Sequence, residues 1–228
     1  MKTLTFETPR SKRTPMPVQV DLCGEHITVQ RPKDSVLFFA QQVAGQSVGE
    51  ADQAMAVLDF VEGTLEPQDR QRFFERICEF NDPVNLDACL TMLTGLVQRW
   101  SNWPDDDPHY EPDPVVVTSD YTPPTDREIP VELPDLDIQL TAYPPKDIVL
   151  LFTSASLATG ANTGQQAWLV ALFLDAALTE QDAWMINRRL RSRDDDLELI
   201  HVAEMVKHLI EAWKPGLNRQ ERRARARS

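Results

Sequence analysis

The sequence lacks the features of a secreted, membrane or disulfide-rich protein. Met1–Glu7 has no apolar core of the kind found in signal peptides, and no apolar run approaches the ~20 residues that cross a bilayer. The 228 residues include only 3 cysteines, and Cys23, Cys78 and Cys89 show no CxxC spacing. These absences favour reduced thiols in a reducing cytosol. When the sequence is displaced by 113 positions, Cys78 falls on Arg191 and Cys89 on Val202, which excludes a disulfide framework or zinc site that recurs along the chain.

Motifs of catalysis are also missing. The chain contains no GxSxG nucleophile elbow and no GxxxxGK[ST] phosphate loop. Gly160–Gly164 is followed by no lysine, so we interpret it as a turn between helices. His201, Glu204 and His208 can share one helical face, but the histidines are i and i+7 rather than i and i+4, which favours a solvated face over a metal site. We therefore expect no enzyme activity, no cofactor and no metal.

What the chain does contain is a second copy of itself, displaced by 113 positions. Pro32–Phe39 recurs as Pro145–Phe152, and Trp100 recurs as Trp213. A fixed offset of this size predicts two tandem homologous domains. A residue that both copies keep is then expected to be structural. The other matched pairs include Gln53 with Gln166, Phe60 with Phe173, Asp69 with Asp182, Leu86 with Leu199 and Met92 with Met205.

The periodicity predicts a mainly α fold, with about four helices in each small domain and a short β-hairpin before them. Alternating apolar residues place the hairpins over 18–29 and 129–140, and the second is expected to turn at Pro134–Asp135. In the first copy, helices are expected to begin at Asp34, near Glu50, at Glu66–Pro67 and near Leu86. Apolar residues three or four apart give each helix one buried face.

Several polar residues are predicted to cap these helices. Asp34 is placed to accept from the amides of Val36 and Leu37. Thr179–Asp182 is close to a capping box. The aligned carboxylates Asp82 and Asp195, the latter within the run Asp194–Asp196, precede the last helix of each copy and are expected to cap it.

Composition divides the chain further. We expect a flexible basic arm at 1–17, a first helical domain at 18–103, an acidic proline-rich linker at 104–128, a second helical domain at 129–216 and an arginine-rich tail at 217–228. The linker composition predicts an extended spacer. The formal net charge of −13 argues against general affinity for nucleic acid.

Three tryptophans are candidate partner contacts. Trp100 and Trp213 close the last helix of each copy, either as plugs of the two cores or as contacts for a partner. Trp103 has no counterpart in the second copy and precedes the linker, so we expect it to be exposed and able to anchor a partner helix.

Two further segments are candidate partner contacts. Val115, Val116 and Val117 stand out within the linker. They form an exposed β-prone patch, add a strand to a neighbouring domain, or offer a strand to a partner's sheet edge. In the basic tail, Arg222 and Arg223 are the remaining candidates.

The order of motifs resembles a known family. The carrying residues are Pro-Lys-Asp-x-Val-Leu-x-Phe from Pro32, the turn Leu65–Asp69, Arg72–Ile77 and Asn81–Leu86, followed by the arginine-rich ending Leu217–Ala224. This pattern resembles the tail assembly chaperones of long-tailed phages of actinobacteria, over about residues 18–100. Unlike the usual family pattern, this chain carries a second full copy.

The resemblance implies a non-enzymatic chaperone in the host cytoplasm. Such proteins coat the tape measure protein, keep it soluble and yield it as tail tube subunits polymerise. The implied partners are the tape measure protein, then the tail tube protein and a second copy of the chain, without a membrane or nucleic acid. Two alternatives remain open: a structural virion adaptor of the tail or connector, and a regulatory or nucleic-acid-binding module acting through the arginine tail.

Overall fold

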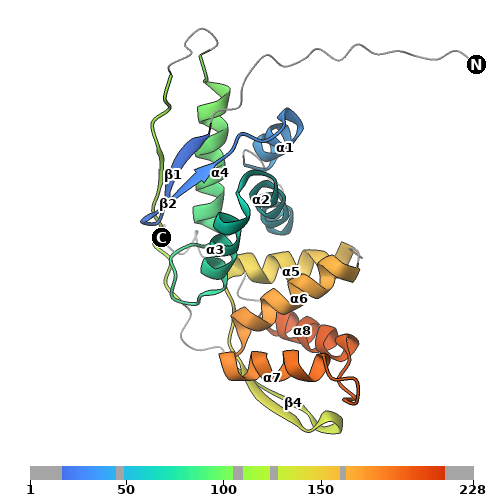
Figure 1. Cartoon of the computed structure of the whole chain (residues 1–228). Coiled ribbons are helices and arrows are strands. Elements are labelled where there is room, and N and C mark those ends of the chain that lie inside the picture. The colour runs from blue at the N-terminus through green and yellow to red at the C-terminus, as the bar shows by residue number, and fades with distance from the viewer. Residues whose placement is uncertain (1–16, 45–48, 105–109, 124–127, 160–162, 214–228) are drawn as a thin grey trace, which may run out of the picture.

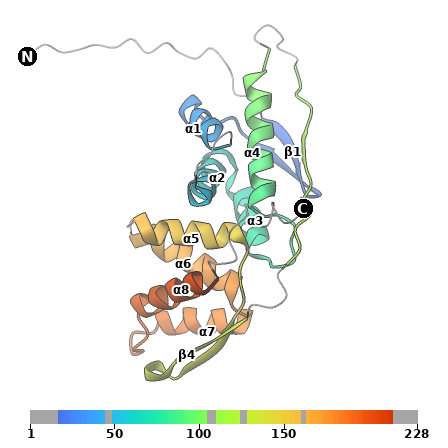
Figure 2. The ribbon, with the colours of Figure 1, turned by 180° about the vertical axis from the view of Figure 1, so that it is seen from behind.

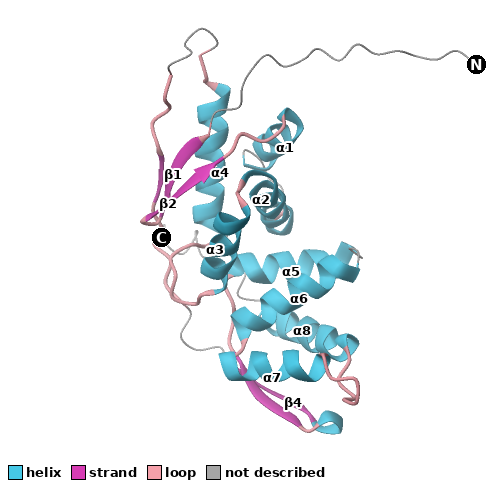
Figure 3. Ribbon diagram, in the orientation of Figure 1, coloured by secondary structure: helices cyan, strands magenta, loops and turns pink. Residues whose placement is uncertain are grey.

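The protein is mainly helical. The structure, a computed structural model, describes residues 17–44, 49–104, 110–123, 128–159 and 163–213. Within these ranges eight α-helices are accompanied by one sheet of three strands and one of two (Figures 1 and 3). No helix in the described part of the chain has the length and apolarity to span a membrane.

The first half, residues 18–117, begins with the predicted hairpin and four helices. Each expected helix start lies within one residue of the observed start. An additional short strand follows the fourth helix. The elements are β1 (Val18–Leu22), β2 (Glu25–Val29), α1 (Asp34–Ala44), α2 (Glu50–Thr64), α3 (Pro67–Cys78), α4 (Leu86–Ser101) and β3 (Val115–Val117).

The second half, residues 129–213, has the same order of hairpin and four helices. Its hairpin differs from expectation at the turn, where a short 3₁₀ helix places Asp137 at φ 50°. Aspartate tolerates this left-handed conformation, so the returning strand begins at Ile138 rather than Leu136. The elements are β4 (Ile129–Leu133), η1 (Pro134–Leu136), β5 (Ile138–Ala142), α5 (Asp147–Thr159), α6 (Thr163–Ala177), α7 (Glu180–Leu190) and α8 (Leu199–Trp213).

The three-stranded sheet recruits a strand from the segment expected to be a linker. β1 pairs with β2 antiparallel, and β3 pairs with the other edge of β1 in parallel, with Val20 opposite Val115. Helix α4 packs over β3 so closely that a Cβ on Gly95 would lie 2.6 Å from Cγ1 of Val115. This part of the linker is therefore built into the first half and does not act as a spacer.

Two of the cap predictions need correction. Thr179 caps α7 as expected, because its Oγ1 accepts from the amide of Asp182 at 3.2 Å. Asp34, however, begins α1 and its carboxylate accepts from Arg31 at 2.9 Å. Asp82 accepts from the amide of Val84 in the loop before α4, and Asp195 accepts from the amide of Leu197 in the loop before α8. The residue that caps α4 is Asn85, whose Oδ1 accepts from the amide of Ala88 at 2.9 Å, so the Asp82 carboxylate braces the loop rather than the helix.

Equivalent contacts recur in the two halves. Phe60 packs on Trp100 with ring centroids 6.1 Å apart, and Phe173 packs on Trp213 at 6.2 Å. After each hairpin, one amide donates to the carbonyl at the end of the second helix of that half. These bonds are Gln30 N to Thr64 O at 3.1 Å and Tyr143 N to Ala177 O at 2.7 Å.

The two halves pack directly against each other. Seen from behind, α5 and α6 lie next to α2 and α3 (Figure 2). The buried apolar residues of both halves form one continuous cluster rather than two separate cores. Residues far apart in the sequence thus create a junction, and this junction positions the candidate site.

Candidate functional site

The histidine and acid groups considered above have structural partners. His201 accepts from the amide of Glu198 through Nδ1 at 3.1 Å, which occupies the ring nitrogen in capping α8. His208 lies 4.0 Å from Glu211. Among the described residues no three His, Cys, Asp or Glu side chains form a group that could hold a metal ion.

In each half one arginine joins the third helix to the hairpin and to the loop before the fourth helix. This set of contacts is here called the arginine bracket. Arg76 donates to the Asp82 carboxylate at 2.7 Å and to the carbonyl of Leu22 at 2.8 Å, which ties α3 to β1 and to the loop before α4. The same bracket is made in the second half by Arg189 to Asp195 at 2.9 Å and to the carbonyl of Leu136 at 2.8 Å. Because both halves keep it, the bracket serves the fold.

Lys146 joins the halves at the junction. Its Nζ donates to the carbonyl of Arg76 at 2.7 Å and lies 3.9 Å from the Asp82 carboxylate, while its side chain is fully buried. It also sits over the ring of Tyr121 at 5.5 Å. Burial lowers the pKa of Lys146 to about 8, and the nearby Asp82 carboxylate opposes that shift. The matching Lys33 in the first half is exposed.

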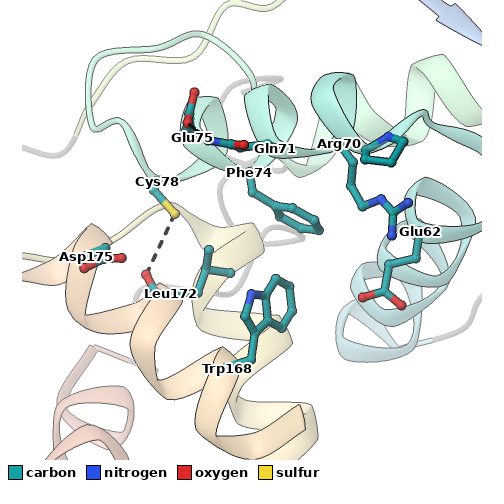
Figure 4. A pocket seen from close by; sticks show the side chains of 10 residues that line it. Glu62, Arg70, Gln71, Phe74, Glu75, Cys78, Trp168, Leu172 and Asp175 are labelled. Carbon is teal, nitrogen blue, oxygen red and sulfur yellow. Dashed lines mark hydrogen bonds between the residues drawn. The ribbon is translucent and has the colours of Figure 1, made fainter. Parts of the chain in front are cut away.

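Beside Lys146 the junction opens into a groove of about 910 Å³, here called the junction groove. Phe74 on α3 and Trp168 on α6 point toward each other and are in contact within this groove. Their ring centroids lie 5.0 Å apart in an edge-to-face arrangement (Figure 4). The groove is lined by Glu62, Pro67, Arg70, Gln71, Phe74, Glu75, Cys78, Trp168, Leu172 and Asp175. Each half supplies one of the two aromatic rings, so the groove exists only when the halves are docked.

The rim of the junction groove is mostly acidic. Glu62, Glu75 and Asp175 outnumber the single cation Arg70, and burial raises the pKa of Asp175. At one end the Cys78 thiol contacts the carbonyl of Leu172 at 3.8 Å (Figure 4). Burial, together with Asp175, raises the pKa of Cys78 to about 12, so this thiol is a poor nucleophile near neutral pH. The groove therefore presents two aromatic rings together with three carboxylates.

Apolar side chains are also exposed outside the groove. Phe38 and Phe39 on α1 are 58% and 66% exposed and meet edge to face at 6.3 Å. Trp184 on α7 is 60% exposed, and the Arg188 guanidinium lies 5.2 Å from its ring. These residues form aromatic surface that is separate from the junction groove.

The predicted tryptophans are not all at the surface. Trp100 and Trp213 are only 2% and 3% exposed, so their rings complete the two ends of the core and do not reach a partner. Trp103 is half-buried, because it packs edge to face against Tyr110 at 5.1 Å. That contact holds the chain where it leaves α4 toward β3, which gives Trp103 a role in the fold.

The predicted strand lies within the protein. Val115 and Val117 are 6% and 1% exposed, whereas Val116 is 66% exposed. The alternative in which the three valines add a strand to a neighbouring domain is the one observed. Arg222 and Arg223 lie outside the described residues.

Sequence reasoning missed the two rings of the junction groove. At an offset of 113 positions Phe74 aligns with Asn187 and Trp168 with Met55, so each ring is present in one half only. That difference was the available signal, since a residue unique to one half can serve an asymmetric contact between the halves. The pairing itself depends on how the halves dock.

Comparisons of the chain with protein-family models, with curated proteins and with solved structures found no match. The residues and geometry of the junction groove therefore carry the functional argument.

Proposed function

We propose that this protein is a phage tail assembly chaperone that binds an amphipathic helix of the tape measure protein and turns over no substrate. The observation that carries the proposal is the junction groove, where Phe74 and Trp168 form an apolar floor beneath an acidic rim. The sequence resemblance from Pro32 to Leu86 supports the choice of client.

The groove suits a helix for two reasons. A client helix presents apolar residues at i, i+3, i+4 and i+7, which can lie over the facing rings of Phe74 and Trp168. The volume of the junction groove, about 910 Å³, is large enough to take several side chains. The carboxylates of Glu62, Glu75 and Asp175 favour lysine or arginine on the flanks of that helix.

We also infer that the two halves arose by tandem duplication of one scaffold. The shared offset, the recurring arginine brackets and the recurring tryptophan contacts support this inference. Because the groove forms between the copies, duplication would have created a site that one copy lacks. A single-copy relative would then need a second subunit to offer the same surface.

The test is co-expression of the full chain with a tape measure protein of a long-tailed phage. We expect the two to co-purify, and Trp168→Ala to reduce recovery of soluble client about tenfold by removing a central aromatic contact. Trp184→Ala is the matched control, because it removes an equally large ring outside the groove. Equal recovery with both variants, or no co-purification by the unaltered chain, would overturn the proposal.

A second measurement separates the chaperone from a structural adaptor. A chaperone is released as the tail tube polymerises, so mass spectrometry of purified particles should find the tape measure protein without this chain. Stoichiometric amounts of the chain in finished particles would favour the adaptor.

A further inference from the structure

In the first half, β3 occupies the space between the free edge of β1 and helix α4, which is here called the strand seat. β3 lies along the free edge of β1 and under α4, with Val115 against Gly95 and the amide of Cys23 donating to the Val117 carbonyl at 2.9 Å. Arg99 on α4 donates to the carbonyl of Asp113 at 3.0 Å and so holds the chain as it enters the seat. Sheet pairing and helix packing together fix this strand.

In the second half, β4 and α8 correspond to β1 and α4. They line a groove that is here called the β4–α8 groove. Its volume is about 860 Å³, and it is lined by β4, η1 and the face of α8 that includes Met205, His208 and Leu209. His208 and Ala212 stand at the positions of Gly95 and Arg99 in the repeat. The groove is therefore the counterpart of the seat that β3 fills, and no strand of the described chain pairs with this edge of β4.

Burial shows the effect of the missing strand. In β1 the alternating residues Val18, Val20 and Leu22 are 0–1% exposed. Val18 pairs with Val29 as Ile129 pairs with Ala142, so strand pairing sets the first strands of the two hairpins 111 rather than 113 positions apart. The residues of β4 that correspond in this register are Ile129, Val131 and Leu133, and they are only half-buried. β4 thus has the alternating apolar residues of a strand that is paired on both edges, but no described strand pairs with its second edge.

The charge of the β4–α8 groove differs from that of the first seat. Among the described residues, its lining includes the acids Glu132, Asp135, Asp196 and Glu204 but no lysine or arginine. Arg99 binds the acidic segment that leads into β3, and the residue at its position in the second half is Ala212. An acidic segment such as the one that carries β3 would meet repulsion here, whereas a basic one would be attracted.

We propose that the β4–α8 groove binds an extended, basic segment of another polypeptide by strand addition. The segment pairs in parallel with Val131–Leu133, as β3 pairs with Val20–Leu22, and places apolar residues at two alternate positions toward α8. Pro130 corresponds to Gln19, which lies outside the β1–β3 pairing, so its missing amide does not interrupt the ladder. This binding site is independent of the proposed client of the junction groove.

Two labelled peptides test the proposal on the full chain by fluorescence anisotropy. One has the sequence of residues 111–119, Glu-Pro-Asp-Pro-Val-Val-Val-Thr-Ser. The other is Lys-Pro-Lys-Pro-Val-Val-Val-Thr-Lys, which keeps the strand and reverses the charge. We expect the basic peptide to bind at least about tenfold more tightly at low salt, with the difference shrinking as salt is added.

Two variants locate the binding. His208→Trp places a large ring where Gly95 makes room for β3, so it should abolish binding of the basic peptide. Lys207→Trp, one residue away on α8 and outside the groove lining, should bind as the unaltered chain does. Thermal melts of both variants check that each is folded.

Three results would overturn the proposal. They are equal binding of the two peptides, unchanged binding by His208→Trp, and binding only after residues 214–228 are removed. The last would show that the chain's own tail fills the groove and that no other polypeptide is needed.

Discussion

The ammonium nitrogen of Lys146 lies 2.7 Å from the backbone carbonyl oxygen of Arg76. This bond crosses from the residue before α5 to the last turn of α3 and is shielded from water, because the lysine side chain is fully buried. Arg76 in turn braces its own half through Asp82. One contact therefore links the docking of the halves to the internal bracing of the first half.

Replacement of this lysine should weaken the whole molecule. Lys146→Met keeps the aliphatic stem but leaves the buried carbonyl of Arg76 without its donor, which costs about 1–3 kcal/mol of unfolding free energy. Urea denaturation followed by circular dichroism measures the change. Lys33→Met alters the exposed counterpart in the first half and should shift stability by less than ~0.5 kcal/mol. Equal effects at the two positions would contradict the role given to Lys146.

The stability contributed by Lys146 should also depend on pH. Burial lowers its pKa from 10.5 to about 8 in the folded protein, so between those values the unfolded chain binds a proton that the folded chain does not. The contribution of Lys146 to the free energy of unfolding therefore rises with pH between about 8 and 10.5. The gap between the unaltered protein and Lys146→Met should widen from about pH 8 to 10.5. A gap that narrows there would be inconsistent with a depressed pKa.

Gly95 should tolerate no side chain while Val115 is present. In Gly95→Ala the added Cβ would approach Val115 Cγ1 to 2.6 Å, and the forced separation of α4 and β3 should cost about 1–3 kcal/mol. Gly63→Ala is the control, since a Cβ there meets nothing within 4 Å. It should stabilise α2 by ~0.5–1 kcal/mol through helix propensity.

A double-mutant cycle completes this test. Val115→Ala removes the methyl groups that the new Cβ would strike, so Gly95→Ala should cost less in its presence. Additive losses would mean that the two residues do not touch.

The bracket of the second half should lose stability in acid. The Arg189 hydrogen bond, followed by that from the Leu197 amide, lowers the pKa of Asp195 below 3.8. The carboxylate thus contributes stability above about pH 3.8, and this contribution is lost as pH falls through the lower folded pKa. Urea midpoints of the unaltered protein and Asp195→Asn should differ at pH 6 and converge in strong acid. Asp194→Asn, at an exposed neighbour, should follow the unaltered curve.

The three thiols should react slowly in the native protein. Burial raises the pKa of Cys78 to about 12 and that of Cys23 to a lesser degree, while Cys89 is 0% exposed. Iodoacetamide at pH 8, followed by peptide mass spectrometry, should label Cys23 first and reach the other two only after unfolding in urea. Fast native labelling of Cys78 would contradict its burial at the junction.

Local signals were enough to predict the hairpins and helices. Pro67 at the start of α3 and Thr179 before α7 act through their immediate neighbours, and the apolar spacing of α4 is a property of consecutive turns. For that reason the expected elements agree with the observed ones to within about two residues.

Contacts between distant residues could not be predicted in the same way. Val115 pairs with Val20, and nothing local to the three valines distinguishes an inserted strand from an exposed one. The burial of Lys146 has the same origin, because the identical Pro-Lys-Asp motif leaves Lys33 in solvent. Phe74 and Trp168 meet only because the halves dock. The junction groove is thus a property of the assembled chain.

The parallel pairing of β3 with β1 has a consequence for synthesis of the chain on the ribosome. β1 is translated before α1 to α4, but the strand that covers its edge is not complete until Val117 has been translated. Throughout the interval in which α1 to α4 emerge, the nascent sheet keeps an unpaired edge that a neighbouring nascent chain can join. Slow elongation between Ser101 and Val117 would lengthen that exposure, so translation speed in this segment bears on the yield of correctly folded protein.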